Sequence, residues 1–153
     1  MPVTRPIDLE VIDYTEELLK KNKMIGRVGL TSDNVRRPHM EVAKVSDKII
    51  LIENHHNAMY KLSGTWSAWN RDYFLLYLKD AKDFWDWEVE GSNKSIQDNF
   101  RIMSFVPPPI RISHLIKNRK FHSDWYKEAY YGNVDMFVED QQEVKKIFKY
   151  EGD

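Results

Sequence analysis

Aromatic residues are concentrated in one stretch of this chain. Nine of the twenty lie between Tyr60 and Trp87, and four of the five tryptophans are among them: Trp66, Trp69, Trp85 and Trp87. Large aromatic side chains dominate the energetics of both cores and interfaces, and Tyr and Trp also carry a polar group that needs a partner when buried. The stretch therefore marks either the centre of the core or a contact surface, and no reaction motif accompanies it.

Length and composition indicate an ordinary globular protein. At 153 residues the chain is long enough to form one core without metals or disulfides, so we predict a single domain over residues 1–153. Hydrophobic residues make up 42% and charged residues 31%, as in soluble domains. The three prolines 107–109 form the one candidate boundary, a rigid spacer before a helical C-terminal segment.

Two absences limit the function classes. The chain has no cysteine, which excludes disulfides, thiolate catalysis and thiolate metal ligands. No stretch has the roughly 18 apolar residues of a membrane span. With a net charge of −1, nothing draws the whole molecule to nucleic acid or to an anionic membrane. We expect a cytoplasmic protein with no membrane contact, or a virion component if the protein is viral. The residue bias is typical of AT-rich genomes, which low-GC bacteria and many phages share.

Local patterns predict a helix at the N-terminal end and a hairpin after it. An apolar stripe through Val11, Tyr14 and Leu18 predicts a helix over residues 9–23, with Asp8 as its N-cap. The polar run over residues 31–38 predicts a loop. From residue 39 the period changes to two, which predicts a hairpin of residues 40–45 and 48–53.

The aromatic stretch itself fits two structures. A second hairpin of residues 73–79 and 84–90 places Trp85 and Trp87 on one face and acidic residues on the other. A helix is the alternative, because Trp66, Trp69 and Tyr73 begin a rough 3.6-residue period. We favour the hairpin and leave the helix open.

Helical signals return after residue 91. Ser95 is the predicted N-cap of a helix that carries Ile96, Phe100 and Met103 on one face. Beyond the prolines we predict a short helix at 124–131, a strand at 134–138 and a closing helix from 139. The predicted fold is α+β: a central antiparallel sheet, with hairpins within about residues 39–90, an N-terminal helix and C-terminal helices.

The surplus of aromatic surface favours recognition over catalysis, because Trp, Tyr and Arg anchor interfaces. We predict a non-enzymatic structural or adaptor protein, plausibly of a phage or virus, that docks into a larger protein assembly or onto its own copies. The predicted interface residues are Trp66, Trp69, Trp85, Trp87, Arg36 and Arg37.

Binding of RNA or single-stranded nucleic acid is the first alternative. Cations interleaved with aromatic residues supply phosphate contacts and stacking platforms. The candidate residues are Arg111, Lys117, Arg119, Lys120, Trp125 and Tyr126.

A metal-dependent nuclease is the second alternative. Asp83, Asp86 and Glu88 have the oxygen ligands that Mg²⁺ prefers. The candidate bases are His55, His56, His114 and His122. Because the chain has no HExxH, P-loop, GxGxxG or GxSxG motif, we assign no catalytic residue, metal ligand or cofactor.

Overall fold

The computed structural model describes residues 7–34 and 37–110, together with positions 116, 117, 120, 121, 142 and 146. The chain divides into two compact units, residues 8–109 and residues 1–7 with 110–153. The division falls directly after the three prolines that the sequence analysis singles out. The unit of residues 8–109, here called the main unit, contains nearly all the described residues.

The main unit is an α+β fold, as predicted. In chain order its elements are α1 (Leu9–Lys21), β1 (Ile25–Gly29), β2 (His39–Lys44), β3 (Ile50–Asn54), β4 (Ser67–Trp69), α2 (Arg71–Leu78), α3 (Phe84–Ser95) and β5 (Arg101–Val106). The described strands of this unit form one sheet in the order β2-β3-β5-β1-β4. Strands β1 and β5 are parallel and the other neighbours are antiparallel, so the sheet is mixed where an antiparallel one was expected.

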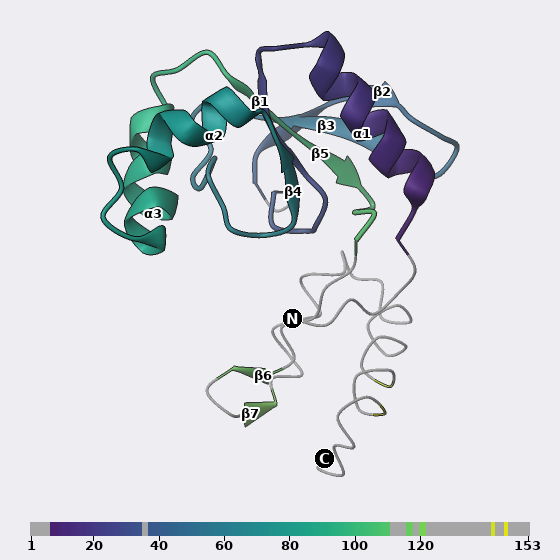
Figure 1. Ribbon diagram of the computed structural model, residues 1–153. Coiled ribbons are helices and arrows are strands. Elements are labelled where there is room, and N and C mark those ends of the chain that lie inside the picture. The colour runs from purple at the N-terminus through teal and green to yellow at the C-terminus, as the bar shows by residue number, and fades with distance from the viewer. Residues whose placement is uncertain are drawn as a thin grey trace. The chain divides into compact units, whose positions relative to one another are not determined.

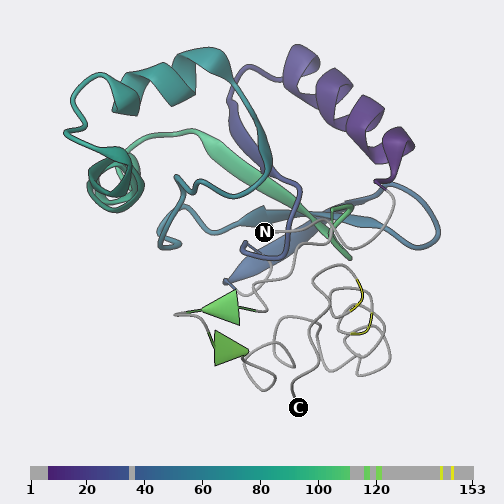
Figure 2. The same cartoon turned by 60° about the horizontal axis from the view of Figure 1, so that its bottom comes forward.

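Two of the local predictions are confirmed. Helix α1 begins after Asp8, whose carboxylate accepts hydrogen bonds from the backbone N–H groups of Glu10 and Val11. Strands β2 and β3 form the predicted hairpin, and the backbone N–H of Val45 closes its turn on the carbonyl of Ile49 at 2.9 Å. Figure 2 shows this hairpin in blue, with its turn projecting from the sheet.

The two faces of the sheet differ in character. Helix α1 covers one face, where Tyr14 meets Phe105 edge to face at 6.3 Å between ring centroids. On the neighbouring strand, Val28 lies opposite Met103 on this apolar face. Because side chains alternate along a strand, Ser104 and its partner Gly29 lie on the opposite face. That second face includes polar residues that are buried.

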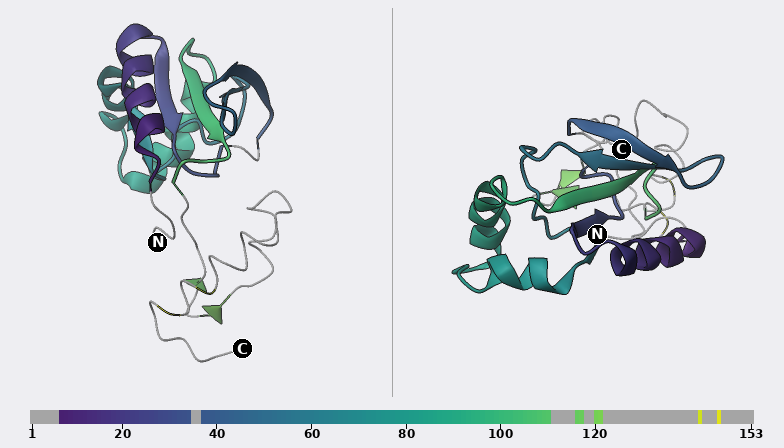
Figure 3. Two further views of the ribbon diagram at one scale, coloured as in Figure 1. Left: turned by 90° about the vertical axis from the view of Figure 1, so that its right-hand side faces the viewer. Right: turned by 90° about the horizontal axis from the view of Figure 1, so that it is seen from above.

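The second predicted hairpin is wrong, and its helical alternative holds from residue 71 onward, whereas Trp69 ends strand β4 and Trp66 precedes it. Residues 71–78 and 84–95 form helices α2 and α3, which pack on each other. Figures 1 and 3 show α1 and α2 on the same side of the sheet, with α3 beside α2. The side chains of Asn70 and Asp83 cap the two helices by accepting backbone N–H groups of their first turns. These caps outweigh the β-propensity of the aromatic residues.

The helices bury much of the aromatic stretch in a core cluster. Its buried members are Leu62, Tyr73, Trp87 and Ile102, and partly buried rings, including those of Trp69 and Phe74, pack against them. The indole of Trp87 lies 5.4 Å from that of Trp69 and 5.1 Å from the ring of Phe74, measured between centroids. Trp87 is only 1% exposed, so it contributes to the core.

The helix predicted after residue 91 is also wrong. Ser95 is the last residue of α3, where its hydroxyl donates to the carbonyl of Ser92, and the chain then enters β5 at Arg101. Phe100 and Met103 therefore belong to the approach to a buried strand and to the strand itself.

The second unit contains one described hairpin, β6 (Ile116–Lys117) with β7 (Lys120–Phe121). The predicted helix at 124–131 and strand at 134–138 lie outside the described residues, as does the closing helix apart from Gln142 and Lys146, which are helical. Within the described part of the chain, no helix has both the length and the apolar character needed to cross a membrane.

Truncation of the two tryptophans of α3 is expected to change stability by very different amounts. Trp87→Ala should lower the free energy of unfolding by about 3–5 kcal/mol, because it opens a cavity among packed rings. Trp85→Ala, two residues earlier on the exposed surface, should change it by no more than about 0.5 kcal/mol. Urea unfolding followed by circular dichroism measures both values, and equal losses would contradict the placement of Trp87 in the core.

Candidate functional site

A buried charge lies on the second sheet face, on the strand next to the β4 edge. Arg27, in the middle of β1, is 0% exposed, and hydrogen bonds use all five N–H donors that a guanidinium carries. Its Nε donates to Ser67 Oγ at 2.8 Å, Nη1 to Asn34 Oδ1 and the Lys61 carbonyl at 3.3 Å each, and Nη2 to Asp33 Oδ2 at 2.8 Å and Thr65 Oγ1 at 2.9 Å. We call these six residues the Arg27 cluster.

The Arg27 cluster connects two loops that are far apart in sequence. Asp33 and Asn34 belong to the loop after β1, whereas Lys61 and Thr65 belong to the long irregular segment between β3 and β4. The Trp69 ring covers the guanidinium, with its centroid 5.3 Å from Arg27 Cζ. A charged group that is both hydrogen-bonded and stacked in this way holds its partners in fixed positions.

The charge of Arg27 also controls the ionisation of Asp33. Burial alone would raise the pKa of this carboxyl group. The positive charge of Arg27 and hydrogen bonds from Arg27, Thr65 and Thr31 outweigh burial, so the pKa of Asp33 lies below its ordinary value of 3.8. Asp33 is therefore an anion at neutral pH, and it pairs with Arg27 in a low-dielectric environment.

A second guanidinium extends the cluster towards the surface. Arg37 Nε donates to the carbonyl of Asp33 at 3.2 Å, and its Cζ lies 5.0 Å from the ring centroid of Tyr60. Tyr60 has a φ of 57°, a left-handed conformation that costs a non-glycine residue roughly 1–2 kcal/mol. Burial lowers the pKa of Arg37, and the nearby positive charge of Arg27 acts in the same direction.

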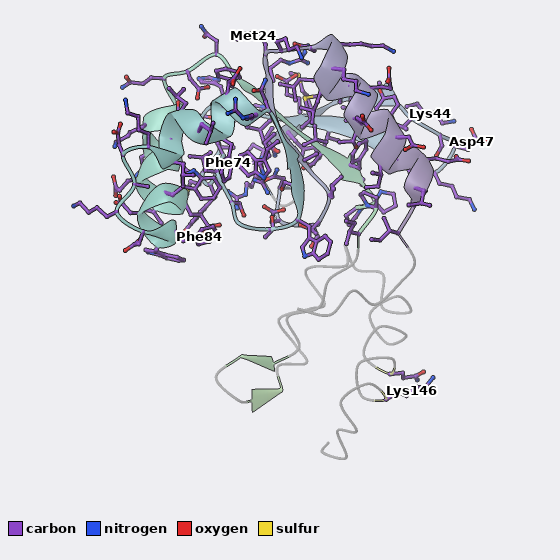
Figure 4. All side chains as sticks on the ribbon, viewed as in Figure 1. Met24, Lys44, Asp47, Phe74, Phe84 and Lys146 are labelled. Carbon is purple, nitrogen blue, oxygen red and sulfur yellow. The ribbon has the colours of Figure 1, made fainter. Side chains whose placement is uncertain are left out.

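Three aromatic side chains are exposed on the segment before β4 and on the first turn of α3. Trp66, Phe84 and Trp85 are 49%, 60% and 65% exposed, and we refer to this set of residues as the aromatic patch. Figure 4 shows Phe84 at the outer end of α3. The Phe84 ring lies over Gly64, where an added Cβ would clash with Phe84 Cζ, so a side chain at this position would displace the ring.

A hydrogen bond fixes the same contact. Glu88, one turn along α3 from Phe84, accepts the backbone N–H of Gly64 through Oε1 at 2.8 Å. The loop that carries Trp66 is thus held to the first two turns of α3, and it is held from the other side by Thr65 and Ser67 of the Arg27 cluster. The aromatic patch therefore has a rigid base.

The structure separates the predicted interface residues. Trp66 and Trp85 are exposed, Trp69 is half-buried over Arg27, and Trp87 lies in the core. Arg37 is half-buried against Tyr60, and Arg36 lies outside the described residues. The interface prediction applies in this structure to Trp66 and Trp85, joined by Phe84, which the sequence analysis did not assign to the interface.

The residues of the two alternatives are placed as follows. Arg111, Arg119, Trp125 and Tyr126 lie outside the described residues, as do His114 and His122, while Lys117 and Lys120 are described only as backbone in β6 and β7. Asp83, Asp86 and Glu88 lie on or before α3, where they accept backbone N–H groups. Within the described residues, no cluster of three or more His, Asp or Glu side chains is arranged to hold a metal ion.

Sequence reasoning missed the Arg27 cluster entirely. One local signal was present, a charge between two glycines in an otherwise apolar run of five residues. Comparison of the chain with protein-family models, with curated proteins and with solved structures finds no significant match. The geometry of the chain itself therefore carries the functional argument.

Removal of the Arg27 side chain should be strongly destabilising. Arg27→Met leaves Asp33 as an unpaired buried charge, so we expect the free energy of unfolding to fall by about 3–5 kcal/mol. The control is Arg71→Met, which removes an exposed arginine at the start of α2 that pairs only with the exposed Asp72, and for which we expect a change of no more than about 0.5 kcal/mol. Chemical denaturation measures both values. If Arg27→Met loses no more stability than Arg71→Met, the Arg27 cluster does not stabilise the fold.

Acid should weaken the fold through Asp33. Because the pKa of Asp33 is lower in the folded than in the unfolded chain, its contribution is complete above the unfolded value and is lost as the pH falls through the folded value. Asp33→Asn lacks this contribution, so its free energy of unfolding should fall less than that of the wild type between about pH 5 and pH 3. If the free energy of unfolding falls equally with pH in the wild type and in Asp33→Asn, the pKa of Asp33 is not lowered by folding.

Proposed function

We propose that this protein is a non-enzymatic binding subunit that docks onto a partner protein through the aromatic patch. The observation that carries the proposal is the exposure of Phe84 and Trp85 side by side at the start of α3, 60% and 65%, on a rigid base. Burial of a Phe side chain is worth about 1.5–3 kcal/mol, and Trp is among the residues most enriched at binding hot spots.

The rigidity of the patch favours binding. Association costs free energy whenever side chains and loops must be ordered at the interface. Here the helix cap of Asp83, the Gly64–Phe84 contact and the Glu88 hydrogen bond order the base of the patch before any partner arrives. A larger share of the contact energy is then available for affinity.

The charges around the patch indicate the chemistry of the partner. Between residues 80 and 90 the chain carries five acidic side chains and one lysine, Lys82. Complementary potentials steer association and exclude wrong partners. We therefore expect a partner surface with an apolar centre to receive Phe84 and Trp85 and a basic rim to face the acidic residues. An assembly of a phage or virus remains our proposal for its setting.

Truncation of the patch should remove binding without unfolding the protein. Trp85→Ala and Trp66→Ala should each cost about 2 kcal/mol or more of binding free energy, an affinity loss of about thirtyfold. The thermal unfolding midpoint should stay near that of the wild type. Affinity capture from the native source, with light scattering on the purified chain, measures the loss of a partner or of self-association.

Leu9→Ala provides the matched control. Leu9 is an exposed apolar side chain at the start of α1, away from the patch, so its truncation should leave binding intact. If Trp85→Ala and Trp66→Ala retain every partner that the wild type and Leu9→Ala bind, the aromatic patch is not the docking surface. If light scattering shows a dimer that Trp85→Ala dissociates, the partner is a second copy of the chain.

A further inference from the structure

Helix α2 presents several apolar side chains to solvent. Three of its eight residues are exposed leucines: Leu75, Leu76 and Leu78 are 41%, 54% and 42% exposed. The core side of the helix is formed by Tyr73, which is fully buried, and by Tyr77, which is half-buried. The right panel of Figure 3 shows α2 at the margin of the main unit. Contiguous apolar surface on a helix at such a margin is typical of a contact with another protein.

Two of these leucines share one side of the helix with two charged residues. An α-helix turns by about 100° per residue, so positions i, i+3, i+4 and i+7 form one stripe along it. In α2 these positions are Asp72, Leu75, Leu76 and Lys79, which we call the α2 stripe. Lys79 is the C-cap and still has helical backbone angles, so it continues the stripe. All four residues are exposed, on the side of the helix that faces away from Tyr73.

The order of the α2 stripe is complementary to itself when the helix is reversed. Asp72 and Lys79 lie at equal distances on either side of the midpoint between Leu75 and Leu76. If two copies of α2 pack antiparallel about a twofold axis at this midpoint, Asp72 of each copy lies opposite Lys79 of the other. Each Leu75 lies opposite Leu76 of the other copy. Like charges at both ends of the stripe would repel in this arrangement, whereas these opposite charges attract.

The two charges of the stripe have no strong partner within the main unit. They are two turns apart, about 10 Å along the helix axis, which is too far for a direct ion pair between them. Asp72 approaches Arg71 at 3.8 Å, and both of these side chains are exposed. Lys79 forms no ion pair with any residue that the structure describes. Both charges are therefore available to a second copy of the chain.

We propose that the α2 stripe is a homodimer contact, in which α2 of one copy packs antiparallel on α2 of the other. The leucines at positions 75 and 76 form its apolar centre, and an Asp72–Lys79 pair closes each end. Packed helices lie roughly 8–10 Å apart, a separation that Lys and Asp side chains can bridge. The contact is distinct from the aromatic patch, whose residues lie on α3 and on the segment before β4.

The size of the contact determines its strength. One eight-residue helix from each copy buries less than the roughly 1,200–2,000 Å² of a stable interface, so the dimer is transient. We expect a dissociation constant of roughly 10–100 μM, so that the dimer forms only at high concentrations of the chain.

The test is sedimentation equilibrium of the full chain and of charge-reversal variants, from about 1 μM to about 1 mM. Asp72→Lys and Lys79→Asp should each weaken the dimer about tenfold or more, because each places two like-charged pairs in every dimer. The double variant exchanges the two charges and restores both pairs. It should dimerise within about threefold of the wild type.

Further variants separate the contact from effects on folding. Glu10→Lys reverses an acidic residue in the first turn of α1, as Asp72→Lys does in α2, and should dimerise like the wild type. Leu76→Ala should weaken the dimer about tenfold, whereas the matched control Leu9→Ala should not. Trp85→Ala should also leave the dimer intact, so that failure of this contact and failure of the aromatic patch are distinguishable.

Three results would overturn the proposal. The first is a monomer at every concentration up to about 1 mM. The second is a double charge-reversal variant that dimerises no better than its two single variants. The third is a dimer that Trp85→Ala dissociates and Leu76→Ala leaves intact, which would place the contact between copies on the aromatic patch.

Discussion

The burial of the Arg27 guanidinium is the constraint on which the rest of this structure depends. Moving one charge out of water costs several kcal/mol, so the fold is stable only if all five donors find acceptors at once. No single segment supplies them. The loop after β1 and the segment before β4 must both close on the guanidinium, and the Trp69 ring must cover it. A local choice in β1 thereby determines the path of residues that lie up to forty positions away.

Hydrogen bonds connect the Arg27 cluster with the end of α3. Lys61 accepts from Arg27 through its carbonyl and donates to Asp98 and Ser95 through its ammonium group, so one residue joins the two regions. Gly29 lies on the same polar face of the sheet, opposite Ser104. A Cβ there would lie 2.6 Å from Ser104 Oγ and 2.8 Å from Asn34 Nδ2, and the close approach of these side chains requires glycine.

Elements whose signals are local could be predicted from the sequence, and elements set by distant partners could not. The cap of Asp8 and the alternation of β2 and β3 act within a few residues, so α1 and the first hairpin were predictable. Aromatic residues fit both periods, and the caps of Asn70 and Asp83 decide the outcome only in competition with β-propensity. Of the interface residues, Trp85 and Trp87 are chemically identical, and only helix packing makes one exposed and the other buried. The buried role of Arg27 could not be predicted from local sequence, because its partners are distributed over residues 33–67.

The loop that supports Phe84 is the same loop that closes on Arg27, because Gly64 lies between Lys61 and Thr65. Arg27 holds this loop at the Lys61 carbonyl, at Thr65 and at Ser67, on both sides of Gly64. Glu88 holds it again at the Gly64 N–H. An exposed ring on a loop with this many fixed points loses little conformational entropy when a partner covers it, so the buried guanidinium on the sheet face also lowers the cost of binding at the surface.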